Sequence, residues 1–575
     1  MKKEYITNAL MYLLIACCVA VGSAALYLGQ RRGDRYYWLL ILVIPFIIAS
    51  YESYKRVKSI KVQKKLRAEW GKADSRKRDM DTVGELFEKL RHEDEIRFFI
   101  DDQTWDDLNM DSIFILLDRT LSTPGEQLLY HMLRTPLFEK EPLEKRKAII
   151  GLFQSNEKMR DFVRLKLRNM GRAPGQFIAS LLWDKTDHEV KGGWLYNVMA
   201  LVAVASCIAP VFMGPKALIT YLFPVYLINN MLHYKAKQNV ESGINALAFI
   251  SRMGGCANAI ARCGFPLGDY KEQLKESLDR CQGVFNSIGM TLFNSGNDLT
   301  EMAGTMFLVQ ERSYCSSFKK MMKHKEDLKR MYVLLGEIDA LMSVASYRQN
   351  LEYYCEPELE HGKAYIDMDS GVHPLIEKPV ANSIHIESRG ILITGSNMSG
   401  KSTFLRTIGV NALFAQTIGT CLALSYNGAY IRIITSISRT DNIMGGKSYY
   451  LSEAESLLRI INEIDGSMPV LSIIDEIFRG TNSIERINAS EEILRNLAGG
   501  NSLSIAATHD MELGDRIGDC YDFYHFSEDV SRDGLFFDYT IKEGLSATRN
   551  AVRIMEYLGY PQDMIVKIKK RVASL

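Results

Sequence analysis

The residues with the clearest chemical potential lie in a glycine-rich segment between an apolar run and a helix pattern. The run Gly390–Thr394 reads as a buried strand, and the sequence GSNMSGKS after it matches the pattern GxxxxGK[ST]. Its glycines let main-chain N–H groups surround phosphate oxygens, and the N-terminus of the predicted helix Thr403–Ala415 favours negative charge. We therefore predict that Lys401 reaches the β- and γ-phosphates of a nucleotide and that the Ser402 hydroxyl binds Mg²⁺.

Two acidic residues and a histidine follow two further apolar runs. Asp475 and Glu476 come directly after Val470–Ile474, and His509 comes after Leu503–Thr508. Beside a phosphate loop, Asp475 is predicted to hold Mg²⁺ through water, and Glu476 to polarise the attacking water as a general base. The imidazole of His509 is suited to sense a γ-phosphate through one hydrogen bond. Together these positions predict ATP hydrolysis.

A second anion-binding feature stands between the first two groups of residues. Gly445 and Gly446 precede Ser448, which reads as the N-cap of a helix whose free N–H groups can bind an anion. Because the chain already holds one phosphate loop, we predict that Ser448 contacts the nucleotide of a second copy in trans. The expected arrangement is an ABC-type head-to-tail homodimer with ATP clamped between two ATPase domains.

The elements that must position these residues change in character near residue 357. After it, short β-branched runs alternate with amphipathic helices, which favours a largely parallel α/β sheet. Before it the pattern is helical, and one apolar stripe at alternating steps of three and four marks a long helix. That stripe fits either packing within one domain or a lever arm. Its residues are Leu328, Met331, Leu335, Ile338 and Met342.

Four uncharged runs interrupt the helical part. Ala9–Leu28 is long enough to span a bilayer, and Tyr36–Tyr51 follows it after the short loop RRGDR. Gly192–Pro215 and Ala217–Leu232 form a second pair. We predict two transmembrane hairpins. The alternatives are a cleaved signal peptide for the first pair and a buried helical hairpin for the second.

The basic residues near the first pair predict its orientation. Seven basic residues and one acidic residue lie between Glu52 and Arg67, which puts this segment on the cytoplasmic side by the positive-inside rule. Two hairpins return the chain to the same side. We therefore predict a multi-pass protein of the cytoplasmic (inner) membrane, with its soluble domains facing the cytoplasm. The bilayer is then a partner, and the run Lys55–Arg67 is expected to face anionic lipid head groups.

Composition constrains the partners and the compartment. The formal net charge is +1, so no global basic field points to nucleic acid, and a DNA-binding surface would have to be a local patch. The ten cysteines show neither a CxxC pair nor a metal-binding spacing. We expect free thiols in a reducing compartment.

Taken together, the motifs resemble those of one family, the DNA mismatch repair protein MutS. The segments TGSNMSGKSTFLR, IIDEIFRGTNS, GGKSYYLSE and ATHD look like its phosphate loop, acidic strand, serine signature and switch. Ile100–Leu137 resembles the start of its helical core, and the resemblance implies ATP and Mg²⁺ as cofactors. The implied nucleotide-binding residues are Gly395, Asn397, Gly400, Lys401, Ser402 and Thr403, with Ser448 acting in trans. The implied catalytic residues are Lys401, Glu476 and His509, and the implied Mg²⁺ ligands are Ser402 and Asp475.

The predicted fold class is α plus α/β, with a helical MutS-like core and lever region, two inserted transmembrane hairpins, and an ABC-type P-loop ATPase domain at the end. The predicted units are a transmembrane hairpin (1–51), a basic helical stalk (52–95), a core-like helical region (96–190), a second transmembrane hairpin (191–234), lever helices (235–356) and the ATPase domain (357–575).

The sequence departs from the family in ways that bear on function. The first hairpin and the stalk stand where the family has a mismatch-reading domain with a Phe-x-Glu wedge, and Pro379 stands where it often has an aromatic residue that stacks on the base. We predict a membrane-anchored ATPase that interacts with DNA and dimerises on binding ATP. The alternative is a membrane-tethered ATPase without DNA recognition that works on the membrane or on an unknown protein partner. Solute export is less favoured, because the hydrophobic runs offer few polar residues to line a path.

Overall fold

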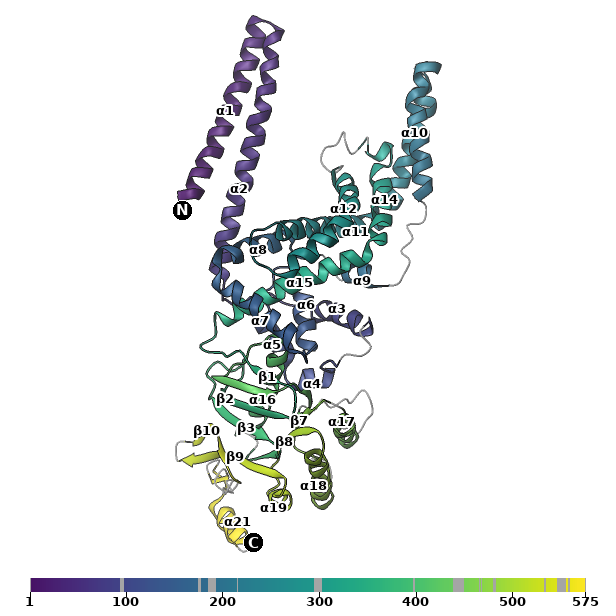
Figure 1. Cartoon of the computed structure of the whole chain (residues 1–575). Coiled ribbons are helices and arrows are strands. Elements are labelled where there is room, and N and C mark those ends of the chain that lie inside the picture. The colour runs from purple at the N-terminus through teal and green to yellow at the C-terminus, as the bar shows by residue number, and fades with distance from the viewer. Residues whose placement is uncertain are drawn as a thin grey trace.

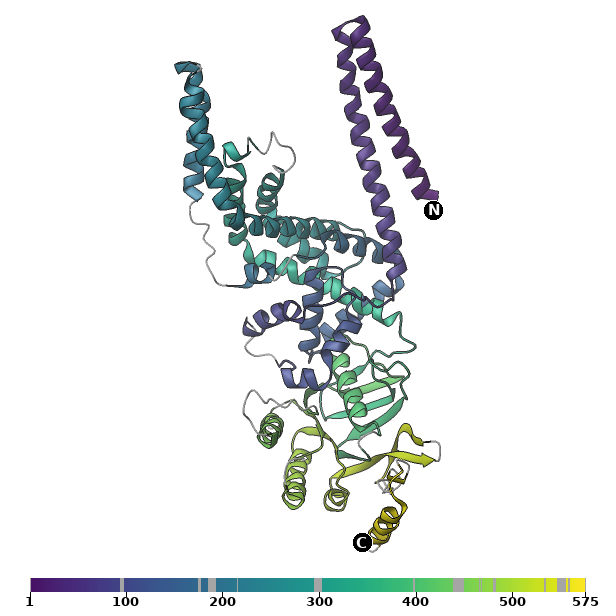
Figure 2. The ribbon, with the colours of Figure 1, turned by 180° about the vertical axis from the view of Figure 1, so that it is seen from behind.

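The computed structural model shows an elongated molecule with an α/β region at one end and two helical hairpins at the other (Figure 1). The view from behind shows both hairpins projecting from the same end of a helical body, while the C-terminus lies at the opposite end (Figure 2). The structure describes residues 2–573 apart from 94–97, 174–176, 185–192, 215, 294–301, 303, 397–398, 438–448, 465, 467, 479–481, 532–533, 546–554 and 557–558.

The α/β region is built on a six-stranded sheet with the order β10-β9-β4-β8-β7-β6. All neighbouring strands are parallel except β9 and β10, which pair antiparallel. Every residue of β4 and β7 is buried, as expected for parallel strands that helices cover on both faces. The strands are β4 (Gly390–Thr394), β6 (Arg432–Ser436), β7 (Val470–Asp475), β8 (Ser502–Ala507), β9 (Tyr521–Ser531) and β10 (Gly534–Glu543).

A second, four-stranded sheet with the order β1-β5-β2-β3 lies in the same region. Strand β3 alternates buried and exposed residues, so only one of its faces is covered. The strands are β1 (Glu358–Glu360), β2 (Tyr365–Gly371), β3 (Asn382–Glu387) and β5 (Ser425–Ala429). The helices of the region are α16 (Lys401–Thr417), α17 (Tyr449–Glu463), α18 (Ser483–Gly499), α19 (Glu512–Ile517) and α21 (Gln562–Ala573).

The helical body is organised around α15 (Lys325–Arg348), which carries the predicted apolar stripe. All five stripe residues are buried in the main hydrophobic core, so the stripe packs inside the molecule. Helix α15 approaches α6 so closely that a Cβ atom at Gly336 would stand 2.6 Å from the main-chain oxygen of Pro124. The other helices are α3 (Met80–Glu93), α4 (Asp102–Asp107), α5 (Met110–Leu117), α6 (Thr123–Arg134), α7 (Lys140–Ser155), α8 (Glu157–Met170), α9 (Phe177–Trp183), α12 (Asp269–Phe293) and α14 (Val309–Lys323).

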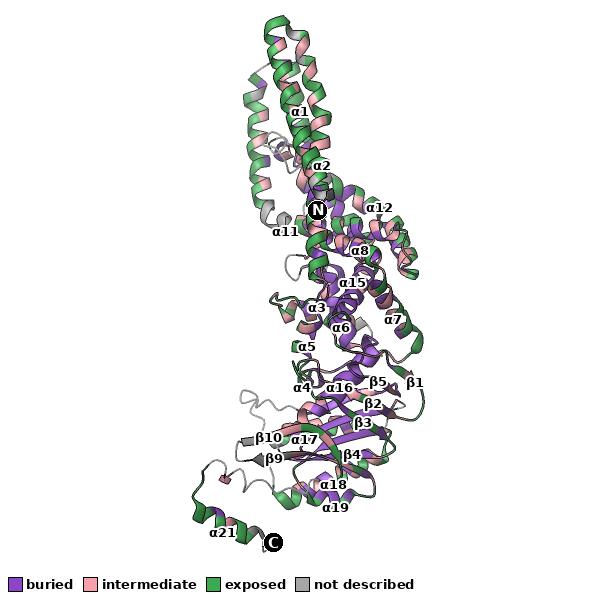
Figure 3. Cartoon of the chain, turned by 90° about the vertical axis from the view of Figure 1, so that its left-hand side faces the viewer, coloured by how far each residue is buried: buried purple, intermediate pink, exposed green. Residues whose placement is uncertain are grey.

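Most residues of the two hairpins are exposed or half-buried (Figure 3), and many of the exposed residues are large and apolar. The first joins α1 (Lys2–Arg32) through the 3-10 segment η1 (Asp34–Leu42) to α2 (Val43–Glu69). The second joins α10 (Gly193–Met213) through the π-helical segment η2 (Leu218–Leu222) to α11 (Phe223–Ala261). Within the described residues, three helices are long and apolar enough to cross a membrane, namely Ile6–Arg32, Trp38–Glu69 and Gly193–Met213.

The fourth predicted membrane run lies in η2 and the start of α11, a helix that continues into the helical body. There Asn229 is fully buried, and its side-chain amide donates a hydrogen bond of 2.6 Å to the main-chain oxygen of Met306. One turn further on, His233 Nδ1 lies 2.5 Å from Glu311 Oε1 of α14. Polar contacts with the body therefore position this limb.

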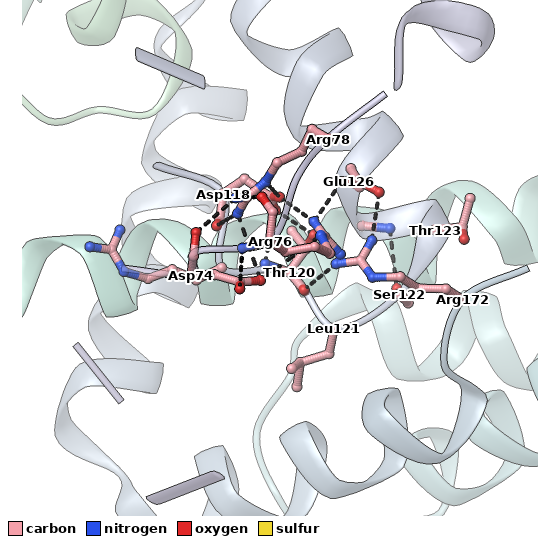
Figure 4. A network of polar contacts seen from close by, with 12 residues as sticks. Asp74, Arg76, Arg78, Asp118, Thr120, Leu121, Ser122, Thr123, Glu126 and Arg172 are labelled. Carbon is pink, nitrogen blue, oxygen red and sulfur yellow. Dashed lines mark hydrogen bonds and ion pairs between the residues drawn. The ribbon is translucent and has the colours of Figure 1, made fainter. Parts of the chain in front are cut away.

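The predicted stalk is divided in two, because α2 ends at Glu69 and α3 begins only at Met80. Between them, Arg76 Nη2 donates hydrogen bonds of 2.6 Å to both Asp118 Oδ2 and Glu126 Oε1, and Arg78 Nε donates to Asp118 at 3.0 Å (Figure 4). Arg172 Nη1 donates to the second oxygen of Glu126 at 2.5 Å. This ionic network attaches the base of the first hairpin to the start of α6.

Candidate functional site

The glycine-rich loop lies between the end of β4 and the start of α16. Gly395 and Gly400 have φ angles of 135° and 108°, in the region that favours glycine. At Gly395 a Cβ atom would also stand 2.7 Å from the main-chain oxygen of Phe526. Lys401 is the first residue of α16, and its buried ammonium donates to the main-chain oxygens of Gly395 (2.6 Å) and Ser396 (2.7 Å). The main chain of the loop thus binds the ammonium group of Lys401.

The order of the strands brings the predicted residues together. Strand β8 lies between β4 and β7, with Ala507 opposite both Ile393 and Asp475. The carboxyl ends of these parallel strands therefore meet at one edge of the sheet, where ligands of open α/β sheets bind. Ser402, in the first turn of α16, donates a hydrogen bond from its hydroxyl to Asp475 Oδ2. This contact joins the glycine-rich loop to the acidic strand end.

Glu476 and His509 lie beside that contact. The Glu476 side chain is only 4% exposed, and its Oε1 lies 3.5 Å from Nδ1 of the half-exposed His509. The backbone of Glu476 has a φ of 56°, an unusual value for a non-glycine residue, and its N–H donates to the oxygen of Ala507 at 2.8 Å. A strained residue held by its neighbours is typical of functional sites. The carboxylate is thereby fixed at the sheet edge.

A cavity of about 490 Å³ opens beside the glycine-rich loop. Pro379 and Val380 line it, so the segment that departs from the family pattern does face this space. His373 also lines it, and burial with the nearby Arg406 lowers the pKa of this imidazole to about 4, so it is neutral near pH 7. The remaining lining residues are Gly371, Ile376, Lys378, Asn382, Gly400, Lys401, Ser402, Thr403, Phe404, Thr407, Phe526 and Tyr539.

Sequence reasoning missed a polar joint that holds the helical body against the site. Asp107, the last residue of α4, is buried and accepts hydrogen bonds from the Thr435 hydroxyl (2.7 Å) and the Ile437 N–H (2.8 Å). Its main-chain oxygen accepts a 2.7 Å bond from Arg406 of α16. The segment TWDD gave no sign of this role, because its partners lie more than 290 residues away.

Two further acidic residues near the site were also missed. Glu453, buried on α17, accepts a hydrogen bond from the main-chain N–H of Phe478, two residues beyond Glu476. Asp510 accepts a bidentate pair from Arg486 of α18, with N–O distances of 2.9 and 2.8 Å. The motif ATHD did contain Asp510, but only its histidine was assigned a role. Both acids fix segments that carry predicted site residues.

Two of the predicted residues, Asn397 and Ser448, lie outside the described residues. The others, Gly395, Gly400, Lys401, Ser402, Thr403, Asp475, Glu476 and His509, lie in the described part of the chain, around the edge formed by β4, β8 and β7.

Comparison with known proteins finds similarity to one family in the C-terminal part of the chain. Residues 391–575 match the model of MutS domain V, and this range contains the glycine-rich loop and the ends of β7 and β8. A protein named DNA mismatch repair protein MutS, from Natronomonas pharaonis, is 28% identical over 244 residues. Residues 391–575 are thus similar to MutS domain V. The aligned part covers 40% of this chain and 28% of that MutS protein.

Proposed function

We propose that this chain is a MutS-family ATPase that binds and hydrolyses ATP with Mg²⁺ at the edge formed by β4, β8 and β7. The observation that carries the proposal is the hydrogen bond from Ser402 to Asp475 Oδ2. A hydroxyl and a carboxylate oxygen in contact are hard ligands of the kind that Mg²⁺ takes. When bound, the ion neutralises charge that develops on the phosphates.

In this proposal each predicted site residue has a distinct role in binding or hydrolysing ATP. Lys401 exchanges its bonds to Gly395 and Ser396 for phosphate oxygens, and the main-chain N–H groups of the loop and of α16 bind the rest of the phosphate charge. Glu476 orients the attacking water and accepts its proton. His509, 3.5 Å from Glu476, forms a hydrogen bond with the γ-phosphate when ATP is bound and loses it after hydrolysis. Thr403, next in α16, and Asn397 complete the nucleotide contacts.

We further propose that ATP joins two copies of the chain into a homodimer, with Ser448 of one copy contacting the nucleotide held by the other. Support comes from α17, which follows Ser448 and whose Glu453 binds the segment just beyond Glu476. If α17 moves when it contacts a second nucleotide, the hydrogen bond from Phe478 to Glu453 would transmit that movement to the segment that carries Glu476. The dimer is expected to form with ATP and to separate after hydrolysis.

Membrane anchoring is the second part of the proposal. The three helices Ile6–Arg32, Trp38–Glu69 and Gly193–Met213 have the length and apolarity to cross a bilayer, and their side chains are largely exposed. Trp38 and Phe212, for example, are 73% and 83% exposed, which is costly in water and favourable in lipid. We propose a multi-pass protein of the cytoplasmic membrane, with both hairpins in the bilayer and the α/β region in the cytoplasm.

We consider two alternative targets for the ATPase, namely DNA and a partner in the membrane. The name of the Natronomonas relative favours DNA, to be bound in the manner of mismatch repair. The two hairpins favour a target in the membrane or a protein partner there. The two are separated by the rate of ATP hydrolysis with and without duplex DNA at increasing salt. A DNA target requires stimulation that fades steeply with salt, because each phosphate contact releases counterions; a rate indifferent to DNA excludes it.

The magnesium assignment is tested by Ser402→Ala, with Ser425→Ala on β5 as a control on an exposed serine. ATP affinity is measured with and without Mg²⁺. The wild type and Ser425→Ala should bind ATP more tightly when Mg²⁺ is present. Ser402→Ala should lose most of that gain, roughly a tenfold effect for one charge-assisted contact. An unchanged gain in Ser402→Ala would contradict the assignment.

A further inference from the structure

Two cysteines face each other where the helical body meets the α/β region. Cys355 lies between α15 and β1, and Cys421 lies four residues beyond the end of α16. They form an isolated antiparallel bridge in which each main-chain N–H donates to the other's oxygen at 2.9 Å. Residues paired in this way have Cα atoms about 5.5 Å apart. That separation lies within the range that an unstrained disulfide spans.

The surrounding joint holds the pair in place. Arg348, the last residue of α15, is buried and donates to the Thr420 hydroxyl (2.8 Å) and to the oxygen of Gly419 (2.7 Å). Its third bond, 2.7 Å long, reaches Glu356 beside Cys355. One guanidinium thus ties both segments that carry the cysteines to the end of α15. These contacts of Arg348 therefore hold the two segments, and with them the two cysteines, next to each other.

The two thiols differ in access and in reactivity. Cys355 is partly exposed, whereas Cys421 is completely buried. A hydrogen bond from the Cys421 side chain, helped by the charge of Arg348, lowers the pKa of Cys355. Burial instead raises the pKa of Cys256 and Cys281 to about 12. An accessible thiol of lowered pKa next to a buried second thiol is the arrangement of an attacking and a resolving cysteine.

We propose that Cys355 and Cys421 form a thiol-oxidation site, which a small-molecule disulfide such as glutathione disulfide converts into an intrachain disulfide bond. The inference stands apart from the proposed ATPase function. Cytosolic disulfides, where they occur, are usually transient and redox-sensing, so the reduced pair in the structure is the expected resting form.

The chemistry balances as two exchange steps. The Cys355 thiolate attacks one sulfur of glutathione disulfide, forms a mixed disulfide, and releases one glutathione thiolate, which takes up the proton that Cys355 lost. Cys421 then loses its proton, and its sulfur attacks the Cys355 sulfur and releases the second glutathione. Two protein thiols are oxidised, and one glutathione disulfide is reduced to two glutathione molecules.

The bond would close a covalent loop that contains β2, β3, β4 and α16, and therefore the whole glycine-rich loop. It would fix the end of α15 to the end of α16, the helix that begins with Lys401. Any movement that α16 passes to the helical body would then be restricted at this point.

The test uses the full chain in detergent, equilibrated in glutathione buffers of increasing oxidised fraction. The protein is quenched with acid, alkylated and digested, and disulfide-linked peptides are mapped by mass spectrometry. The proposal expects the peptide pair containing Cys355 and Cys421 to appear at the lowest oxidised fraction, while the other eight cysteines stay alkylated. It is overturned if both thiols remain alkylated throughout, or if another pair forms first.

Single variants separate the two roles. Cys421→Ser should leave Cys355 as a mixed disulfide with glutathione, Cys355→Ser should leave Cys421 alkylated as in the reduced protein, and the control Cys263→Ser should keep the linked pair. Glutathione on Cys421 in Cys355→Ser would contradict the order of attack. If either variant does not fold, the peptide map of the wild type still decides. All readouts are covalent, so an inactive ATPase would not affect them.

Discussion

The α/β region and the helical body hold their buried polar groups in different ways. At the sheet edge, Ser402, Asp475 and His509 come from short segments at the ends of neighbouring strands, and the strand order alone brings them together. In the helical body, Asp339 of α15 accepts hydrogen bonds from the main chain of Leu121 and from Ser122, more than 200 residues earlier. The first arrangement leaves a motif in the sequence. The second leaves no local pattern, although it determines how the body packs.

From this difference we expect that loss of a long-range polar contact destabilises the fold, whereas a change at the sheet edge inactivates the protein. The largest effect on stability is expected for Asp107→Ala, which leaves the buried Thr435 hydroxyl and Ile437 N–H without their acceptor. Two buried donors without an acceptor should lower the unfolding free energy by about 2–6 kcal/mol. Urea unfolding of the detergent-solubilised chain measures this loss of unfolding free energy.

The matched control is Asp106→Ala, which removes an exposed carboxylate from the same helix. It should change the unfolding free energy by less than about 0.5 kcal/mol. Equal losses in the two variants would mean that the Asp107 joint contributes nothing of its own, and the comparison between the two regions would lose its main support.

A pH-dependent effect on stability is expected from Asp339. Burial raises the pKa of this carboxyl from 3.8 to about 7, against the opposing hydrogen bonds from Ser122 and Leu121. The folded chain therefore binds this proton more tightly than the unfolded chain, so the contribution to stability is complete below about pH 4 and is lost as the pH rises to about 7. At about 1.4 kcal/mol per pKa unit, the rise from 3.8 to about 7 makes this loss on the order of 4 kcal/mol.

Asp339→Asn removes this titration while keeping a side-chain oxygen as acceptor. Its unfolding free energy should depend less on pH between 4 and 7 than that of the wild type, whereas Asp279→Asn, on an exposed face of α12, should follow the wild type. Parallel pH profiles for all three proteins would show that Asp339 does not titrate in this range.

The local elements of the site could be predicted from the sequence. The predicted strands Gly390–Thr394, Val470–Ile474 and Leu503–Thr508 agree with β4, β7 and β8 to within one residue at each end. The predicted helix after the glycine-rich loop lies within α16. These segments are specified by apolar runs and glycines only a few residues apart. The residues that determine each element are therefore close together in the sequence, where a pattern can be recognised.

The joints between distant segments could not be predicted. Charged residues such as Arg76 and Asp107 look like ordinary surface residues in the sequence, and only the fold buries their contacts. The break in the predicted stalk could not be read from the sequence for the same reason, since the chain leaves α2 to make the ionic contacts of Arg76 and Arg78 before α3 begins. A charge pattern gives helix propensity but does not reveal a partner 42 residues away.

The most direct test of the central claim is ATP hydrolysis by the full chain in lipid nanodiscs, for the wild type, Glu476→Gln and the control Glu492→Gln, an exposed glutamate on α18. If Glu476 is the general base of an ATPase, Glu476→Gln should lose roughly 10²- to 10⁴-fold in rate while still binding ATP, and Glu492→Gln should match the wild type. A Glu476→Gln protein that hydrolyses ATP at the wild-type rate would contradict the account.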